Sequence, residues 1–530
     1  MQSPRGWTIY RAAYADHPIK EYNASPLIRA LEILPNHLEL QAKLTAFPQW
    51  SAADRLMPRE VRIQKLILGM YKFFLGLPRT VELYELIHTM VCTGYLDRIP
   101  HSAADQARRQ DVYERHQRRE TFTVEDVDEE AVDLSAALIG IPGGGKTQGV
   151  KHTTRDLRRV IYHPDLDIYQ IPALLIQMPY KGVSVLSLGE RIVRALDRAF
   201  PQANYAKHYL SGRRPNAENL FMTAVQLMQT HYVGILIIDE SQNKEYRSKS
   251  VSRRGANESD GQSPLATLLI SAMNASNIPI LLTGTPELPE LLGVRMSMLR
   301  RLVGRGMRVW KSLTLTKNAG PAGSVEMGEF DTLLTVLWDF QWTKTEFKYS
   351  LRMRNLFYYY SQGVIDVLIK LFQDVQLRAI RNGGDEIVDE ALVHEVATEE
   401  LKALTNLTAG MRKEDAEVTR RAVDLAAYLR IDPHVLTPER KLVKDAIDGK
   451  DENFEYSSDE DEDEGGSAGP DALSRTPESE AGPKKRTSFK NPPRRRAKPH
   501  ESLPNSRSAQ KKSVPPAIKP VVDLNKELNR

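Results

Sequence analysis

Short apolar runs alternate with helically spaced apolar residues through the middle of the chain, from about residue 126 to 315. Uninterrupted runs of about four to eight apolar residues are typical of strands buried on both faces. Helical spacing between such runs is typical of the crossovers that join parallel strands. The pattern therefore predicts an α/β domain with a parallel sheet. Its strands are expected at 132–139, 173–178, 233–238 and 279–285. Helices are expected after residue 147 and up to residue 159, at 186–200 and at 224–230.

Helical spacing dominates on both sides of this region. In residues 1–125 it covers 27–34 and 58–77, whereas 7–23 is aromatic and irregular; 108–119 is a basic helical run, suited to a solvated face or to nucleic-acid contact. We expect a helical N-terminal extension at 1–125 for partner docking, the α/β domain at 126–315, and a helical lid and extension at 316–430. The lid helices are expected at 332–340, 356–380, 389–404 and 414–429.

The last hundred residues, 431–530, have a different composition. An acidic run at 451–464 precedes a linker-like stretch, and basic clusters follow at 484–512. Few apolar residues remain there to offset the entropy of ordering, so we expect a mostly disordered tail. Its acidic and basic segments are either a solubilising device or a tether for a partner.

Composition narrows the class of protein further. At 530 residues, with 41% hydrophobic and 27% charged residues, the chain is long enough for two or three folded domains. Its one cysteine, Cys92, excludes a disulfide framework or a cysteine-rich metal site. We expect a cytoplasmic protein without a membrane segment, because neither a signal peptide nor an apolar run of membrane-spanning length is evident.

A glycine-rich run follows the first predicted strand and precedes a helix. It fits the P-loop pattern, in which glycine backbone N–H groups and a helix N-terminus surround phosphates. Lys146 would reach the β- and γ-phosphates of ATP, and the Thr147 hydroxyl would be a ligand for Mg²⁺. The nucleotide-binding residues predicted here are Gly140, Gly143, Gly144, Gly145, Lys146 and Thr147.

Two carboxylates follow the apolar strand 233–238. Asp239 at the strand's end would hold Mg²⁺, and Glu240 would polarise the attacking water, as in a Walker B element. A core strand that ends in acidic residues by chance is the alternative, but the preceding P-loop makes an ATPase the better interpretation.

The order of these features resembles that of AAA+ ATPases: P-loop, acidic pair, a strand that ends in threonine, arginines, then a helical lid. The run at 210–213 lacks the glutamine and second glycine of an ABC transporter signature. The resemblance implies that a polar residue on the strand after the acidic pair positions water, with Thr285 preferred and Thr283 the alternative. It also implies a catalytic arginine donated by an adjoining subunit, for which Arg300, Arg301 and Arg305 are candidates.

Several local runs narrow the resemblance to the TnsC family, the AAA+ regulators of transposons with a heteromeric transposase. They keep their order over about residues 8–400 and are Ile9-Tyr10-Arg11, Asn23-Ala24-Ser25-Pro26-Leu27-Ile28, Val91-Cys92-Thr93-Gly94-Tyr95, Tyr113-Glu114-Arg115, Ile161-Tyr162-His163, Ala195-Leu196-Asp197-Arg198-Ala199, Gly284-Thr285-Pro286 and Ser361-Gln362-Gly363-Val364-Ile365-Asp366. The resemblance implies an ATP-dependent homo-oligomer, a ring or filament on target duplex DNA, that links a target-selector protein to the transposase.

A regulator directed by a selector needs no base readout, so we expect sequence-independent contacts to phosphate. The candidates are Lys181, just past strand 173–178, and a polar loop at 246–262 that is otherwise an ordinary surface loop. In that loop the cations are Arg247, Lys249, Arg253 and Arg254.

Two matters stay open at this stage. No arginine near Gly363 to Asp366 fills the lid role called sensor 2 in AAA+ proteins. The nucleotide chemistry also suits an AAA+ helicase loader or replication initiator, or a weakly hydrolysing scaffold that uses ATP only to hold an oligomer together.

Overall fold

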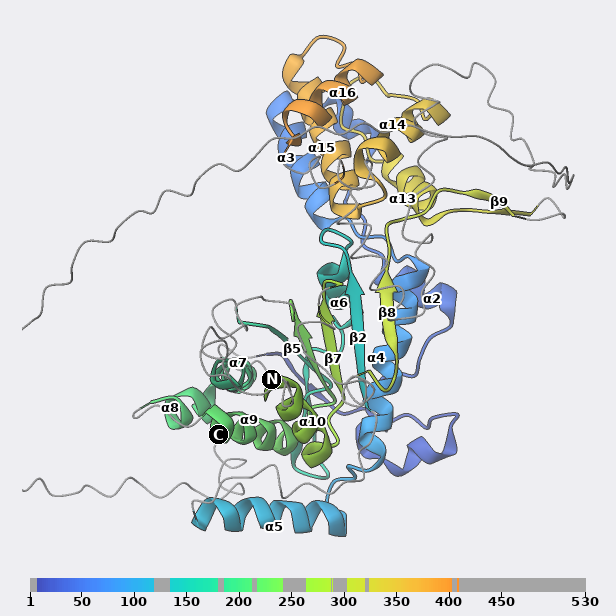
Figure 1. Ribbon diagram of the computed structural model, residues 1–530. Coiled ribbons are helices and arrows are strands. Elements are labelled where there is room, and N and C mark those ends of the chain that lie inside the picture. The colour runs from blue at the N-terminus through green and yellow to red at the C-terminus, as the bar shows by residue number, and fades with distance from the viewer. Residues whose placement is uncertain are drawn as a thin grey trace, which may run out of the picture. The chain divides into compact units, whose positions relative to one another are not determined.

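The computed structural model describes residues 7–118, 134–179, 185–211, 217–241, 264–286, 288, 303–319, 324–402 and 408 (Figure 1). The predicted helix at 414–429 and the tail at 431–530 lie outside the described residues. None of the described helices combines the length and the apolar character needed to cross a membrane.

A five-stranded parallel sheet forms the middle of the described chain (Figure 1). Its order is β5-β6-β7-β2-β8, so the first strand in sequence lies between the last two. In an open sheet of this kind ligands bind at the carboxyl ends of the strands, where the strand order reverses, which here is the end of β2. The strands are β2 (Ser135–Gly140), β5 (Ala173–Gln177), β6 (Ile235–Asp239), β7 (Ile280–Gly284) and β8 (Met307–Trp310).

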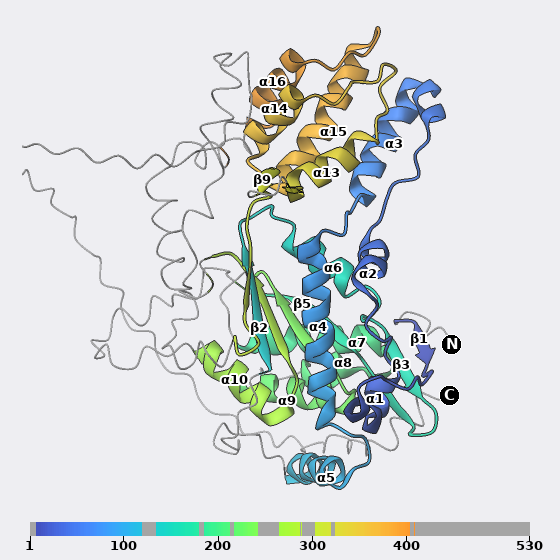
Figure 2. The same ribbon diagram turned by 90° about the vertical axis from the view of Figure 1, so that its right-hand side faces the viewer.

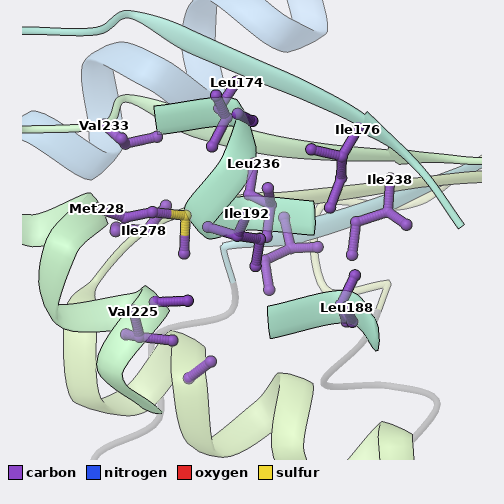
Figure 3. Packing of buried hydrophobic residues seen from close by; sticks show 14 of the residues in the cluster. Leu174, Ile176, Leu188, Ile192, Val225, Met228, Val233, Leu236, Ile238 and Ile278 are labelled. Carbon is purple, nitrogen blue, oxygen red and sulfur yellow. The ribbon is translucent and has the colours of Figure 1, made fainter. Parts of the chain in front are cut away.

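One face of the sheet is covered by helices that follow its strands. α7 (Val185–Ala199), α9 (Ala217–Thr230) and α10 (Pro264–Ser276) pack there. Side chains of α7 and α9, such as Ile192 and Val225, meet Leu236 and Ile238 of β6 in a buried cluster (Figure 3). The alternation of strands and helices predicted from the sequence is confirmed on this face, where apolar strands lie against amphipathic helices.

The N-terminal segment covers the opposite face. α4 (Pro78–Leu96) runs beside the sheet, and α1 (Pro26–Arg29) packs near it (Figure 2). A second sheet joins β1 (Ile9–Arg11), parallel, to β3 (Val160–His163), which pairs with β4 (Ile168–Gln170). This half also contains the helices α2 (His37–Leu44), α5 (Ala103–Arg118) and α8 (Tyr205–Tyr209).

A second hydrophobic core contains the lid helices together with α3 (Arg59–Lys72) of the N-terminal segment. Buried Arg62 of α3 donates hydrogen bonds to both carboxylate oxygens of buried Glu386, one of them at 2.6 Å. The lid helices are α13 (Glu329–Trp338), α14 (Leu351–Ser361), α15 (Ile365–Asn382) and α16 (Glu390–Glu399), preceded by a hairpin of β9 (Lys317–Ala319) and β10 (Ser324–Glu326).

Several predicted helices are wrong in extent. The helix expected at 58–77 is α3, which ends at Lys72, and the helix expected at 224–230 is α9, which begins at Ala217. The helix expected at 356–380 is two helices, because Gln362 and Gly363 both have positive φ, at 49° and 71°, and turn the chain between α14 and α15. The helix expected at 27–34 ends at Arg29. The helix after the P-loop is α6 (Lys146–Thr153), which ends well before residue 159 because the chain turns there into β3.

Candidate nucleotide site

The P-loop lies where β2 ends, at the carboxyl edge of the five-stranded sheet. Gly140 is the last residue of β2, and the N–H of Gly144 donates to the Ile141 carbonyl at 3.2 Å within the loop. Gly143 and Gly145 have φ of 77° and 85°, values that residues with a Cβ rarely adopt. Gly145 is also the N-cap of α6, so the N-terminus of that helix, the positive end of its dipole, lies at the loop. The loop therefore has the geometry of a phosphate cradle.

Lys146 begins α6 and its side chain folds back over the loop. Its Nζ donates to the carbonyl oxygens of Gly140 at 2.7 Å and Ile141 at 2.9 Å. Burial lowers the pKa of Lys146 below the ordinary lysine value, although the nearby carboxylates of Glu240 and Asp239 oppose that shift. The ammonium group is thus held beside the loop, where added phosphates would favour its charged form.

The two acidic residues occupy different environments at the end of β6. Asp239 is 3% exposed, and its Oδ1 accepts hydrogen bonds from the Glu240 N–H at 2.9 Å and from the Thr283 hydroxyl. Glu240 is exposed and has φ of 56°, an uncommon conformation for a residue with a side chain. Backbone strain of this kind is frequent at functional sites. The Asp239 carboxylate is therefore held in place by hydrogen bonds, whereas Glu240 is exposed at the end of the strand.

The register of the sheet explains why Thr283 meets Asp239. Ile238 pairs with Leu282, so the next residue of each strand, Asp239 and Thr283, lie side by side at the carboxyl edge. Thr285, preferred from sequence, follows the end of β7 and is half-buried. The geometry thus gives the alternative candidate, Thr283, the direct contact with the acidic pair.

Thr147 and Asp239 fit a magnesium ion held mainly by a nucleotide. Thr147 lies in the first turn of α6, and Asp239 presents a carboxylate from the neighbouring part of the same edge. Among the described residues, no group of three or more acidic, histidine or cysteine side chains is arranged to hold a metal ion. Mg²⁺ commonly binds through one or two protein oxygens together with substrate phosphates, and this donor set matches that mode.

The lid touches the P-loop directly, a contact that the sequence did not predict. The Asp366 N–H donates to the Gly143 carbonyl at 3.0 Å, and an added Cβ on Gly145 would lie 3.2 Å from Ile365 Cδ1. The nearest lid cation on this helix, Lys370, is paired with the Asp366 carboxylate at 2.7 Å. The start of α15, where the AAA+ resemblance implies a sensor 2 arginine, therefore carries an acidic residue and a lysine one turn later.

Other predicted site residues are not near this edge or are not described. Arg305 is exposed, and its N–H donates to the carbonyl of Ser135 at 2.8 Å, at the opposite end of β2 from the P-loop. It cannot act on the nucleotide of its own chain in this arrangement. The candidates outside the described residues are Arg300, Arg301, Lys181, Arg247, Lys249, Arg253 and Arg254.

Comparison with protein families gives one match to this part of the chain. The family model described as an AAA domain matches residues 132–292, which include the P-loop, the acidic pair and β7. This segment is therefore similar to AAA domains. Its sheet and helices have the α/β architecture that the AAA+ resemblance implied, so the fold class predicted from the sequence is confirmed.

Two solved structures show remote likeness to the chain. The Orc1 protein of Aeropyrum pernix, in complex with DNA, is 15% identical, with a TM-score of 0.32, over 61% of this chain and 68% of that one. The Cdc6p protein of Pyrobaculum aerophilum is 13% identical, with a TM-score of 0.30, over 57% and 67%. Because both TM-scores are low, neither likeness supports a conclusion about function. A comparison with curated proteins gives no match.

Proposed function

We propose that the AAA domain binds and hydrolyses ATP at the carboxyl edge of β2, β6 and β7. The observation that carries this proposal is the convergence of three groups: the Lys146 ammonium, the buried Asp239 held by Thr283, and Glu240 turned toward solvent. Lys146 and the loop N–H groups bind the phosphates. Glu240 orients the attacking water and accepts its proton, while Thr283 keeps the Asp239 carboxylate in place.

Thr147 and Asp239 would hold Mg²⁺, which when bound neutralises phosphate charge. The remaining charge that develops during hydrolysis requires a cation that the described part of this chain does not bring to the site. An arginine from an adjoining subunit, Arg300, Arg301 or Arg305, fits that role, so hydrolysis is coupled to assembly of a homo-oligomer. The contact between Asp366 and Gly143 lets the lid respond to the state of the P-loop.

We further propose that this oligomer is a transposition regulator on target DNA, which joins a target-selector protein to transposase subunits. The resemblance to the TnsC family supports this, because its local runs are built into the fold. Ile9–Arg11 pairs in register with β3, which contains Ile161-Tyr162-His163, and Ser361-Gln362-Gly363-Val364-Ile365-Asp366 reaches the P-loop. Of these runs, the one at 361–366 thus lies against the nucleotide site.

Electron microscopy with ATP, Mg²⁺ and unrelated duplexes tests the assembly, and phosphate release tests the chemistry. Lys146→Ala should abolish ATP binding and assembly, since it removes the cation that faces the phosphates. Glu240→Gln should keep ATP and prolong the assembled state, because only water activation is lost.

Parental hydrolysis by Glu240→Gln would refute the base assignment. Rings or filaments that form without ATP would refute the nucleotide switch, and a complete protein that supports no transposition with its transposase would refute the regulatory role.

A further inference from the structure

A cavity of about 750 Å³ opens at the outer edge of the five-stranded sheet. It lies along β5, which within the described sheet pairs only with β6, and it is walled by α6 and α7. Residues 175–177 of β5 form its floor, and Asp239 lies at its end nearest the nucleotide site. The cavity is therefore next to the site described above but extends away from it along α7.

Four cations line this cavity: Lys151 of α6, and Arg191, Arg194 and Arg198 of α7. The arginines are spaced by three and four residues, so they share one face of the helix. The opposite face, with Leu188 and Ile192, is buried against the sheet. Burial of the apolar face therefore fixes all three arginines on the cavity side.

No contact within the described fold accounts for the three arginines on this face of α7. All three are exposed, and none forms an ion pair or hydrogen bond in the part of the chain that the structure describes. By contrast, Arg378 of the lid pairs with three glutamates. Two carboxylates, Glu190 and Asp239, also line the cavity, so its four cations leave an excess of positive charge. An anionic ligand would satisfy this excess.

The spacing of the arginines fits a nucleic-acid backbone. At about 1.5 Å per residue, Arg191 and Arg198 lie roughly 10 Å apart along the helix axis. Each strand of a duplex carries one phosphate per about 3.4 Å of the duplex axis, so a row parallel to that axis spans about three of them. Guanidinium groups bind phosphate oxygens through paired N–H donors, whereas base recognition requires groups that enter a groove. The row is suited to backbone contact without sequence preference.

We propose that this cavity, the α7 cleft, holds the sugar-phosphate backbone of duplex DNA, bound by Lys151, Arg191, Arg194 and Arg198. The inference rests on the proposed function and names the surface through which the oligomer contacts its DNA. In the sequence, α7 begins four residues after Lys181, the residue for which the sequence predicts a phosphate contact.

Fluorescence anisotropy of two unrelated labelled duplexes, with ATP and over a range of salt concentrations, tests the cleft. In the triple variant Arg191→Gln, Arg194→Gln, Arg198→Gln we expect at least ~10-fold weaker binding to both duplexes. The slope of log affinity against log salt should become shallower by about 2 to 3, because roughly 0.9 is lost per phosphate contact. The triple lysine variant at the same positions should keep most of the slope, since it keeps the charge.

A matched control removes three exposed cations elsewhere: Lys20→Gln, Lys72→Gln, Lys348→Gln. It changes the net charge equally and should stay within about twofold of the wild type, because only local phosphate contacts enter the salt slope. Circular dichroism checks folding of every variant, and titration with a fluorescent ATP analogue is run in parallel.

Each alternative has its own result. Wild-type affinity and slope in the triple glutamine variant would overturn the cleft, and loss of ATP-dependent assembly in that same variant would make it a contact between subunits. Loss of ATP binding in that variant would make the cavity part of the nucleotide site, which also overturns the proposal. A wild-type protein that binds no duplex would overturn the cleft and the DNA part of the proposed function together.

Discussion

The backbone N–H of Asp366 donates a hydrogen bond to the carbonyl of Gly143 at 3.0 Å, joining the first turn of α15 to the P-loop. Val364 and Ile365 pack against the same loop, at the positions where glycines leave room for them. A P-loop that moves on binding phosphate must therefore move against the lid. The close packing of the lid on the loop depends on a glycine at position 143, because any side chain there would contact Val364 and Asp366.

Gly143→Ala should weaken ATP binding, by at least ~10-fold. The new Cβ would lie 3.0 Å from Val364 Cγ1 and 3.3 Å from Asp366 Cβ, and φ at this position is 77°. A left-handed conformation costs a residue with a Cβ roughly 1–2 kcal/mol even without a clash. Titration with a fluorescent ATP analogue measures the effect.

Gly384→Ala is the matched control for this substitution. Its φ is also positive, at 64°, but an added Cβ meets nothing within 4 Å. It should cost stability through the backbone alone and leave ATP affinity unchanged. Equal ATP affinity in the two variants would mean that the contact between the lid and the P-loop does not matter for binding.

Thr283→Val should slow hydrolysis more than Thr285→Val, by at least ~10-fold in kcat. Valine keeps the shape of Thr283 but removes the hydroxyl that donates to Asp239, leaving a buried carboxylate oxygen with one bond fewer. Steady-state phosphate release at saturating ATP separates the two variants. A greater loss in Thr285→Val would return the water-positioning role to the residue first preferred from the sequence.

This pair also shows where sequence reasoning stops. Thr283 and Thr285 are two residues apart, so strand alternation places both on one side and cannot choose between them. The choice depends on the pairing of Ile238 with Leu282, a contact between distant parts of the chain. By contrast, Lys146 and Asp239 were predictable, because a loop or a strand end specifies each of them through its immediate neighbours.

Short elements and chain reversals limited the prediction of the fold. β1 has three residues and pairs with β3, about 150 residues later, so no local period indicates it. The break between α14 and α15 was missed because the apolar spacing continues across it. Its cause is tertiary: a Cβ on Gly363 would lie 2.3 Å from the Leu313 carbonyl oxygen, so the turn fits only glycine there.

ATP affinity should fall as the pH rises through the lowered pKa of Lys146 toward 10.5, the ordinary lysine value. Burial favours the neutral amine in the free protein, whereas bound phosphates favour the ammonium. Binding above the free-state pKa therefore requires uptake of a proton, and the affinity declines by up to about tenfold per pH unit. Below that pKa the lysine is already protonated, so its ionisation should no longer change the affinity with pH.

Lys146→Arg provides the control for the pH profile, since a guanidinium stays protonated throughout this range. Its affinity for ATP is expected to be lower but flat with pH. Isothermal titration in buffers of different ionisation heat would detect the proton uptake in the wild type alone. A wild-type profile as flat as that of Lys146→Arg would show that the ammonium is not perturbed in the free protein.

Arg62→Met should destabilise the lid core by about 3 kcal/mol, because it removes the buried guanidinium and leaves the Glu386 carboxylate with only its contacts to Lys344. The two side chains are 1% and 2% exposed, and Arg62 also donates to the Trp342 carbonyl at 2.8 Å, so the pair links α3 to the lid. Arg62→Met combined with Glu386→Gln removes both charges and should recover part of the loss.

Arg352→Gln, which breaks an exposed pair with Glu390, should cost no more than about 1 kcal/mol. Urea unfolding followed by tryptophan fluorescence compares the four proteins, and equal midpoints for Arg62→Met and Arg352→Gln would show that the buried pair does not hold α3 to the lid.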